Sequence, residues 1–481
     1  MWNTKVLLVQ VLLAVGISAA TSLSSAESSG EDSSSMSREC PLEDQVNLSL
    51  NLGGIGISHL PDGFIQNEFV TRLNLDGNRI NHVTSATFSH LPRLRHLSLA
   101  DNMIPSLDLG AFAELKNLET LNLNDNCRSP SVRQDITFVR SDFMSRAIIR
   151  PVLFDRGILT CTLRFDSLLP RLTHLFVENN DLEHLSFVSG GLPNLTELHL
   201  CRNPMLDLNE EEVSNLKKFA PALNGLHFTQ SCVHKFDASL LPNLSTLRLD
   251  GNDIQSVCRS YCEGRFLKLA NSKLEKLSLR NNTITKMEVD SFSETPNLVT
   301  LDLSRNFISE IRNGTFDNLQ SLRFLYLQHN NILTNGIRHA FGGLVNLEIL
   351  HLESNELSTI AGDIFSNLAS LKQLTLNYTG ISSLDNQLLS ELSKLEVLSL
   401  AGNDLSMIPE DALPTSGSLK TLNLNNNQFT NIENIRINKM PNLRILSLTE
   451  NPLAVISARW FSKVPETMTL ILQGNESELP V

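Results

Sequence analysis

Apolar residues recur at fixed short spacings along this chain, most clearly between Asn297 and Leu325. Leu298, Leu301 and Leu303 are three and two residues apart, and an asparagine follows three residues after Leu303. A spacing of two is the period of a β-strand, so Leu301 and Leu303 face one way and the residue between them faces the other. The asparagine can donate to and accept from backbone groups that a turn leaves unpaired. The pattern therefore predicts a short strand followed by a turn.

The same pattern recurs about every 24 residues over most of the chain. One unit cannot bury its own leucines, whereas a stack of units shares one continuous core. The second leucine of each repeat, here called the marker leucine, lies at residues 73, 97, 121, 277, 301, 325, 350, 374, 398, 422, 446 and 470. Between them the rhythm is irregular, and the best register places markers at Val152, Leu175, Leu198, Leu226 and Leu247. With a degenerate first unit at Leu50, the sequence predicts a solenoid with about 18 parallel strands on its concave face.

Phenylalanine recurs 15 residues after the marker leucine in several units. Stacked units would place these rings in one column behind the strands. We therefore expect a buried spine formed by Phe88, Phe112, Phe292, Phe316, Phe365 and Phe461.

Between residues 45 and 475 the chain resembles the extracellular leucine-rich repeat family, whose pattern is L-x-x-L-x-L-x-x-N-x-L. The resemblance implies an α/β solenoid shaped as a horseshoe, with a parallel sheet on its concave face. Adhesion proteins, immune sensors, receptor ectodomains and enzyme inhibitors share this fold, so the fold does not give the function. An apolar N-terminal run, mid-chain cysteines and no membrane span make the chain similar to the secreted leucine-rich-repeat immune proteins of insects. Many of those end in a coiled coil, so this chain resembles a coil-less member.

The sequence predicts three successive regions. Residues 1–20 resemble a secretory signal peptide, with cleavage as late as residue 26. The alternative is a retained signal anchor, but the apolar run Val6–Ala20 is short for a membrane span. Residues 21–39 form a Ser-rich disordered leader, and 40–481 form a single solenoid that is irregular and cysteine-rich between about 124 and 274. We expect a secreted, extracellular protein. Its charge of 39 − 52 = −13 makes it a poor candidate for binding nucleic acid, and no basic stripe argues otherwise, so we expect no nucleic-acid partner.

Seven cysteines and seven N-x-[ST] sequons fit the secretory route. Proximity favours the disulfides Cys127–Cys161, Cys201–Cys232 and Cys258–Cys262, although spacing alone leaves the connectivity open. This pairing leaves Cys40 for an intermolecular disulfide. The predicted glycosylation sites are Asn47, Asn194, Asn243, Asn281, Asn313, Asn377 and Asn475.

Two groups of large side chains interrupt the small polar residues expected along the concave face. One comprises His174, Phe176, His199, His227 and Arg248, and the other comprises Phe324, Tyr326, His329 and His351. Such side chains are typical of protein hot spots, although ordinary surface variation is the alternative. A third candidate is the arginine-rich stretch Arg128–Arg156. It is either a binding site for an acidic protein or glycan, or simply a solvated loop.

The sequence contains few signs of metal or catalytic chemistry. His199 and His227 should lie on adjacent strands, where they could share a zinc ion or sense pH. A zinc site needs at least three protein ligands, and no H-E-x-x-H, paired C-x-x-C or carboxylate triplet of known spacing supplies the third. No G-x-S-x-G, phosphate loop or dinucleotide motif is present. We therefore expect no metal, no cofactor and no enzymatic activity.

These observations favour a secreted recognition protein that binds another protein in innate immunity. The alternative is a component of the extracellular matrix or of cell adhesion. A homodimer or heterodimer could form through Cys40 or through the C-terminal repeats. There Leu470 and Leu472 indicate one more strand, near the end of the sequence, without an evident cap.

Overall fold

The computed structural model describes residues 47–127 and 161–473, except 204, 205, 207, 261, 361, 415, 416, 455, 465 and 466. These residues all belong to one compact unit, Asn47–Val481. Several sequence-based predictions lie outside the described residues: the signal peptide, the leader, Cys40, the arginine-rich stretch, Val152 and Asn475.

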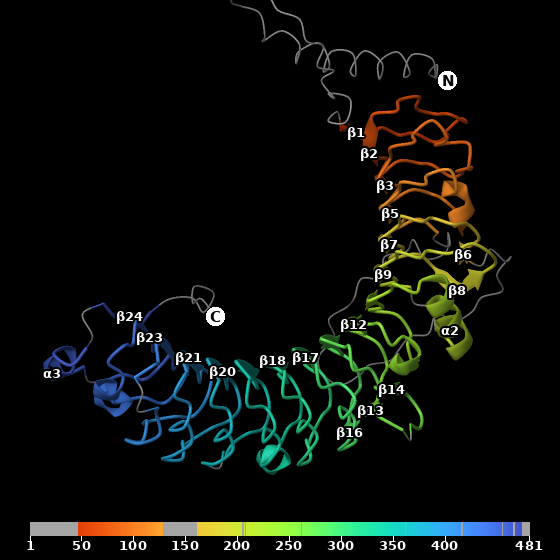
Figure 1. The fold of residues 1–481 in the computed structure, drawn as a ribbon. Helices are drawn as coiled ribbons and strands as arrows, with labels where there is room; N and C mark the ends of the chain where they lie inside the picture. Colours follow the sequence, from red (N-terminus) through yellow and green to blue (C-terminus); the bar gives the residue numbers. More distant parts are fainter. Residues whose placement is uncertain are drawn as a thin grey trace, which may run out of the picture. The chain divides into compact units, whose positions relative to one another are not determined.

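A parallel sheet of 17 strands forms the solenoid in the described part of the chain. Neighbouring strands align their marker leucines, as where Leu301 is the Cα partner of Leu325. Within this unit the strands follow the concave side of the coil (Figure 1). The predicted parallel solenoid is therefore confirmed. The strands are β1 (Leu48–Asn51), β2 (Val70–Asn74), β3 (His96–Ser98), β5 (Thr120–Asn122), β7 (His174–Phe176), β9 (Glu197–His199), β10 (Gly225–His227), β12 (Thr246–Arg248), β15 (Lys276–Ser278), β17 (Thr300–Asp302), β18 (Phe324–Tyr326), β19 (Ile349–His351), β20 (Gln373–Thr375), β21 (Val397–Ser399), β22 (Thr421–Asn423), β23 (Ile445–Ser447) and β24 (Thr469–Ile471).

The predicted marker Val152 lies outside the described residues, and the sheet passes directly from the strand before it to the strand after it. Strand β5 pairs directly with β7, and Leu121 is the partner of Leu175, so no strand lies between them. Val152 precedes Leu175 by 23 residues, which is close to the common repeat length. Repeat length alone suggested a strand there, whereas among the described residues Leu121 pairs with Leu175.

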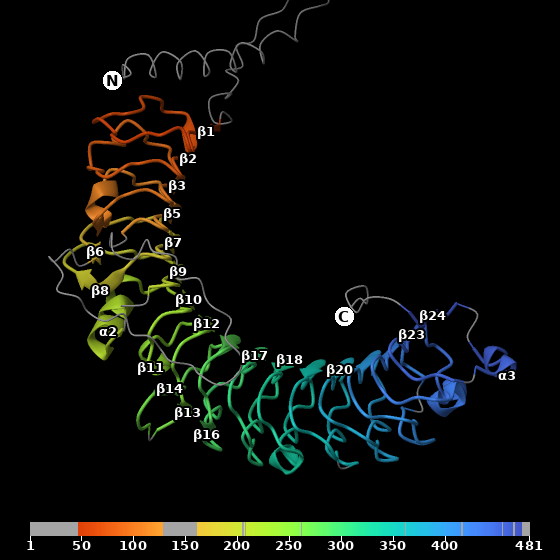
Figure 2. The same ribbon diagram turned by 180° about the vertical axis from the view of Figure 1, so that it is seen from behind.

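The irregular middle of the chain contains extra structure on the side of the coil opposite the large sheet (Figure 2). One small parallel sheet comprises β4 (Leu107–Asp108), β6 (Cys161–Phe165) and β8 (Leu182–Phe187). A second comprises β11 (Lys235–Asp237), β14 (Phe266–Lys268), β13 (Ser256–Cys258) and β16 (Lys286–Met287). The long repeat between Leu247 and Leu277 contributes both β13 and β14, and this extra strand accounts for its length.

Helices occur on the same side. Helix α2 (Glu210–Phe219) occupies the long repeat between Leu198 and Leu226, and Asn209 and Glu212 form a capping box at its start. The others are short: η1 (Leu109–Phe112), η3 (Ala238–Leu240), η4 (Thr334–Ile337), η5 (Ile432–Ile435), η6 (Ile437–Lys439) and α3 (Ala458–Phe461).

Buried asparagines form a ladder that joins successive repeats. The Nδ2 of Asn306 donates to the Leu303 oxygen in its own repeat, at 3.0 Å, and to the Leu279 oxygen in the preceding repeat, at 2.9 Å. Its Oδ1 accepts from the Ile284 N–H at 3.0 Å. The expected pairing of turn backbone by asparagine is therefore confirmed. Buried backbone groups that lacked these partners would each cost about 1–3 kcal/mol.

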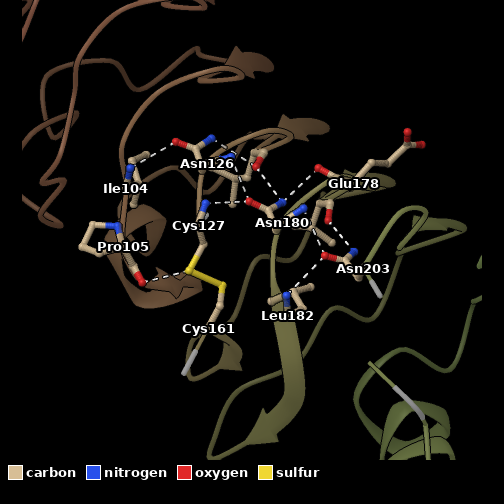
Figure 3. The surroundings of a disulfide bond; sticks show 11 residues. Ile104, Pro105, Asn126, Cys127, Cys161, Glu178, Asn180, Leu182 and Asn203 are labelled. Carbon is tan, nitrogen blue, oxygen red and sulfur yellow. Dashed lines mark hydrogen bonds between the residues drawn. A yellow bond between two sulfur atoms is a disulfide. The ribbon is translucent and has the colours of Figure 1, made fainter. Parts of the chain in front are cut away.

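The ladder passes directly from Asn126 to Asn180 next to the Cys127–Cys161 disulfide (Figure 3). The Oδ1 of Asn180 accepts from the backbone N–H groups of Asn126 and Cys127, at 2.9 and 2.8 Å. Asn203 continues the ladder by accepting from the Asn180 N–H at 3.1 Å. The disulfide thus joins Cys127 to Cys161 at a point where the asparagine ladder runs on without a break.

The phenylalanine spine is present in part. Ring centroids lie 6.3 Å apart for Phe88 and Phe112, and 5.7 Å apart for Phe292 and Phe316. Phe365 stacks on Phe341 at 6.1 Å. The prediction for Phe461 is wrong, because this ring is 54% exposed and the neighbouring Trp460 is fully buried. Helix α3 presents the earlier residue to the core, and the larger indole fills the place expected for phenylalanine.

One position in almost every repeat has a left-handed backbone. It is the fourth residue after the marker leucine, with φ of 56° at Arg305, 55° at Ser354 and 65° at Gly402. Only glycine adopts this conformation without a steric cost, which is about 1 kcal/mol or more for other residues. Stacking holds the turn in place, as where the Arg305 N–H donates to the Gln328 oxygen at 2.8 Å.

The strand expected at Leu470 is β24, which pairs with β23. Leu470 is half-buried and Leu472 is 40% exposed, whereas the equivalent Leu446 in β23 is fully buried. Among the described residues β24 has a neighbouring strand on one side only, which explains the incomplete burial. Association through these repeats stays a prediction.

Candidate recognition surface on the large sheet

Four adjacent strands, β7, β9, β10 and β12, carry the first group of large side chains. Their register makes Phe176 and His199, His199 and His227, and His227 and Arg248 successive Cα partners. Side chains on alternate positions of a strand share a face, so these residues form one row on the concave face. We call Phe176, His199, His227 and Arg248, with the exposed His174 beside them, the ring patch.

The rings of the patch stack on one another. Phe176 and His199 have centroids 4.4 Å apart, and His199 and His227 lie 4.2 Å apart with only 4° between their planes. His174 lies farther from Phe176, at 6.4 Å. Stacked rings give a flat, rigid surface of large area, and flat rigid rings are effective anchors for a binding partner.

Two glutamates hold the histidines in place. His199 Nδ1 lies 3.4 Å from Glu178 Oε1, and His227 Nε2 lies 3.0 Å from Glu197 Oε2. Gly225 makes the second contact possible, since a Cβ at that position would overlap the Glu197 carboxylate. The hydrogen bond from His199 lowers the pKa of Glu178 below its ordinary value. Burial and the neighbouring His199 lower the pKa of His227, which favours its neutral form.

Glu178, Glu197 and Gly225 did not appear among the sequence-based candidates. Most of those candidates came from the residue between the two leucines of each repeat. Glu197 and Gly225 occupy the other outward position, two residues earlier, and Glu178 lies just beyond β7. A reading of both outward positions would have placed Glu197 beside the histidines. Glu197, His199 and His227 are the described residues whose grouping could hold a metal ion, with ligand atoms within 4.8 Å of one another.

A groove of about 630 Å³ adjoins the ring patch. It lies over the turns that follow the strands, and its lining includes Glu178, Cys201, Arg202, Thr229, Gln230, Arg248, Asp250, Gly251, Arg280, Asn281 and Arg305. Four arginines and two carboxylates give this lining a formal charge of 4 − 2 = +2.

Two of the arginines in the groove face carboxylates. Arg202 lies 3.5 Å from Glu178, and Arg248 lies 3.6 Å from Asp250. Burial raises the pKa of Asp250, against the opposing hydrogen bond from Ser278. These ion pairs are partly exposed and therefore weak, so the guanidinium groups can be recruited by an acidic ligand.

The cysteine predictions have mixed outcomes. The structure contains the disulfides Cys127–Cys161 and Cys258–Cys262. The predicted Cys201–Cys232 disulfide is not formed. Cys201 is the third residue after its marker leucine and Cys232 is the sixth after its own, so stacking does not align them. Cys201 instead hydrogen-bonds Thr229, the third residue after the next marker, and burial raises the pKa of its thiol.

The second group of large side chains is only partly assembled. Tyr326 and His351 lie on adjacent strands with ring centroids 5.3 Å apart, and His351 Nδ1 lies 3.3 Å from Glu353. Phe324 occupies the other outward position of β18, beneath the Arg323 guanidinium at 5.6 Å. His329 belongs to the left-handed turn position, with φ of 56°, and therefore lies off the strand row.

The sequons within the described residues differ in accessibility. Asn47, Asn194, Asn243, Asn281 and Asn313 are exposed, whereas Asn377 is half-buried. The Oδ1 of Asn377 accepts from the Ala401 N–H at 2.9 Å, which ties this side chain to the next repeat. Asn281 lines the groove. Glycan attachment at each of these sites stays a prediction.

Comparison with known proteins identifies the family. A family model described as "Leucine rich repeat" matches residues 70–127, 272–332, 345–405 and 417–476, and a second model of that description matches 321–344. The chain belongs to the leucine-rich repeat family. In the described residues no helix is long and apolar enough to cross a membrane.

Several curated relatives share part of the sequence. Human Toll-like receptor 9 is 27% identical over 299 residues, covering 54% of this chain and 27% of the receptor. Osteomodulin of Rattus norvegicus is 34% identical over 269 residues, covering 55% of this chain and 52% of its own length. The chain thus spans about half the length, or less, of these relatives.

Two solved structures show the same fold. A leucine-rich repeat protein of Leptospira interrogans has a TM-score of 0.58 and 20% identity, covering 88% of this chain and 94% of its own. A chain of the Drosophila Toll–Spatzle complex has a TM-score of 0.62 and 18% identity, and the match covers 84% of this chain and 51% of that chain. At these identities the likeness concerns the fold alone.

Proposed function

We propose that this chain is a secreted recognition protein that binds a protein ligand in innate immunity, through the ring patch and the adjoining groove. The observation that carries the proposal is the continuous stack of Phe176, His199 and His227 beside four groove arginines. Rings and arginines gathered at one place are typical of binding hot spots. The signal-like residues 1–20 support secretion, and the similarity to Toll-like receptors supports an immune role.

The chemistry of the surface defines the ligand. The stacked rings offer a flat apolar area, which suits an aromatic or aliphatic side chain of the ligand. The groove offers guanidinium groups, each of which can hold a carboxylate with two hydrogen bonds. The ligand therefore carries an apolar anchor next to acidic side chains.

Glycans restrict where such a ligand can bind. A glycan on Asn377 would lie at the edge of the sheet, and one on Asn281 would occupy part of the groove. We therefore expect the ligand to bind between His174 and Arg248, although Asn194 and Asn243 flank this stretch. Removing the Asn281 sequon with Asn281→Gln should strengthen binding if that glycan is present.

The test is recovery of partners from the fluid into which the protein is secreted. Replacing Phe176, His199, His227 and Arg248 together by Ala should weaken binding of the recovered protein by more than about 2 kcal/mol, or roughly 30-fold. The control is Phe324→Ala with Tyr326→Ala, in the second group. If the control variant loses more affinity than the ring-patch variant, the assignment to the ring patch is wrong.

The alternative function is that of an extracellular matrix or cell-adhesion component, which the similarity to osteomodulin supports. The same recovery experiment distinguishes the two. A soluble defence protein as the stable partner supports recognition in immunity. Recovery of matrix or membrane material alone supports the alternative.

A further inference from the structure

We propose that Glu197, His199 and His227 bind a divalent transition-metal ion, with zinc as the best match. Their ligand atoms lie within 4.8 Å of one another, and the three side chains are half-buried. Zinc accepts imidazole nitrogen and carboxylate oxygen at about 2.0–2.2 Å, and three protein ligands with one open position are typical of reactive zinc sites.

The contacts already present bring the ligand atoms near the separations that one ion requires. Ligand atoms of a tetrahedral zinc lie about 3.4 Å apart, as follows from bonds of about 2.1 Å. Glu197 Oε2 and His227 Nε2 are 3.0 Å apart, close to that value. The rings of His199 and His227 lie face to face with 4° between their planes, so the two imidazoles must turn out of this stack for both nitrogens to point at one ion.

A further carboxylate prepares His199 for this role. Glu178 Oε1 lies 3.4 Å from His199 Nδ1, so the Nδ1–H faces a carboxylate and Nε2 is left as the ligand atom. Metal-binding histidines are commonly oriented by a carboxylate in this way. Glu178 is therefore a positioning residue, and Gly225 leaves the space in which the Glu197 carboxylate lies.

The absence of a zinc motif in the sequence follows from how the site is built. Each strand contributes one or two ligands, and the register of β9 and β10 brings them together. Motifs of close spacing, such as two histidines four residues apart on a helix, detect sites on one element only. A site that crosses two repeats leaves no local pattern.

The experiment is a zinc titration of the metal-stripped full chain near neutral pH, followed by calorimetry and by competition with a chromophoric chelator. The wild type should bind one zinc ion at this site. His199→Ala with His227→Ala should weaken that binding by at least about 100-fold, and Glu178→Gln by about 10- to 100-fold. Gly225→Ala should also weaken it, because the added methyl group displaces the Glu197 carboxylate.

The matched control is His351→Ala with Glu353→Gln, which removes another histidine–glutamate pair of the same sheet, at 3.3 Å. This variant should keep the wild-type zinc affinity. The proposal is overturned if the wild type binds zinc no more tightly than the double-histidine variant, or if the control loses as much affinity. Circular dichroism checks that each variant is folded, and Glu197→Gln replaces the double variant if that one fails to fold. Zinc binding is measured on the isolated chain, so its outcome is independent of any protein ligand.

Discussion

Gly402 faces the ring of Tyr378, so that a methyl group at this glycine would overlap the ring carbons. Both residues hold the left-handed turn position of successive repeats, with φ of 65° and 54°. The glycine thus meets two demands at once, a left-handed backbone and room for an aromatic side chain.

Gly402→Ala should destabilise the protein by about 1–3 kcal/mol, since the alanine must adopt a left-handed φ and also push the ring aside. Ser354→Ala is the control at the equivalent turn position, where φ is already 55° with a side chain present. That change should alter stability by less than about 0.5 kcal/mol. Urea denaturation measures both values. Equal losses in the two variants would contradict this account of the turn.

Asn306→Ala should cost about 1–3 kcal/mol, because it leaves the buried Ile284 N–H without its acceptor. The Leu279 and Leu303 oxygens lose one donor each but keep the Nδ2 of Asn282 and of Asn330. Asn306→Thr should lose less. Thr379 occupies the equivalent position in another repeat of this chain, and its Oγ1 donates to the Leu376 oxygen of the same repeat at 2.8 Å.

The control for the ladder is Asn297→Ala in the same repeat. Asn297 is exposed, and its Nδ2 donates to the Ser272 oxygen at 2.7 Å. Loss of one exposed hydrogen bond should cost less than about 1 kcal/mol. If Asn306→Ala is no worse than Asn297→Ala in denaturant unfolding, the ladder does not stabilise the stack.

The two disulfides should differ in their effect on stability. Cys127–Cys161 spans 34 residues and Cys258–Cys262 spans 4. Loop-closure entropy then gives about 4 kcal/mol for the first and about 2 kcal/mol for the second. Thermal unfolding of Cys127→Ser with Cys161→Ser, against Cys258→Ser with Cys262→Ser, tests the order. Peptide mapping without reduction should find both bonds and no Cys201–Cys232 bond.

Acidification should destabilise the fold partly through His96. Burial lowers its pKa below the ordinary 6.5, helped by Arg72, Arg95 and His174 and opposed by Glu119. The folded state therefore favours the neutral ring. The resulting contribution of His96 to the free energy of unfolding is fully present above pH 6.5 and is lost as the pH falls through 6.5 toward the folded-state pKa.

The measurement is the free energy of unfolding at several pH values on either side of that range. His96→Gln should flatten its dependence on pH relative to the wild type. The control is the same substitution at the exposed His59. An identical slope in the His96 variant and the wild type would refute the assignment.

Much of the fold could be predicted because one short pattern specifies both the strand and the turn. Marker leucines such as Leu301 and Leu325 pair as expected. The predictions that the structure did not follow rested on residue spacing alone. Repeat length placed a marker at Val152, yet the described sheet pairs Leu121 directly with Leu175, and Phe461 matched a spacing while Trp460 took the buried place.

The ring patch could be predicted because Phe176, His199, His227 and Arg248 share one column, with His174 beside them. Its carboxylates could not be predicted from that column, since Glu178 and Glu197 occupy other positions in the repeat. The contact of Glu197 with His227 also depends on a missing side chain, at Gly225. The Cys201–Cys232 disulfide was predicted because the two cysteines lie on consecutive repeats. They occupy different positions within their repeats, so stacking does not bring them together.

The asparagine ladder makes the two ends of any shortened version unequal. Asn306 bonds to the repeat before it, so removing everything from its repeat onward leaves the Leu279 oxygen and the Ile284 N–H without that partner. Removing the preceding repeats instead takes away the Glu275 and Ile284 oxygens, which accept from the N–H groups of Val299, Thr300 and Phe307. A shorter scaffold built from this chain therefore needs a cap at either cut, but of different chemistry. A cut after the Ile284 repeat requires an acceptor for the Ile284 N–H, which Asn306 otherwise supplies, whereas a cut before the Asn306 repeat requires acceptors for three backbone N–H groups.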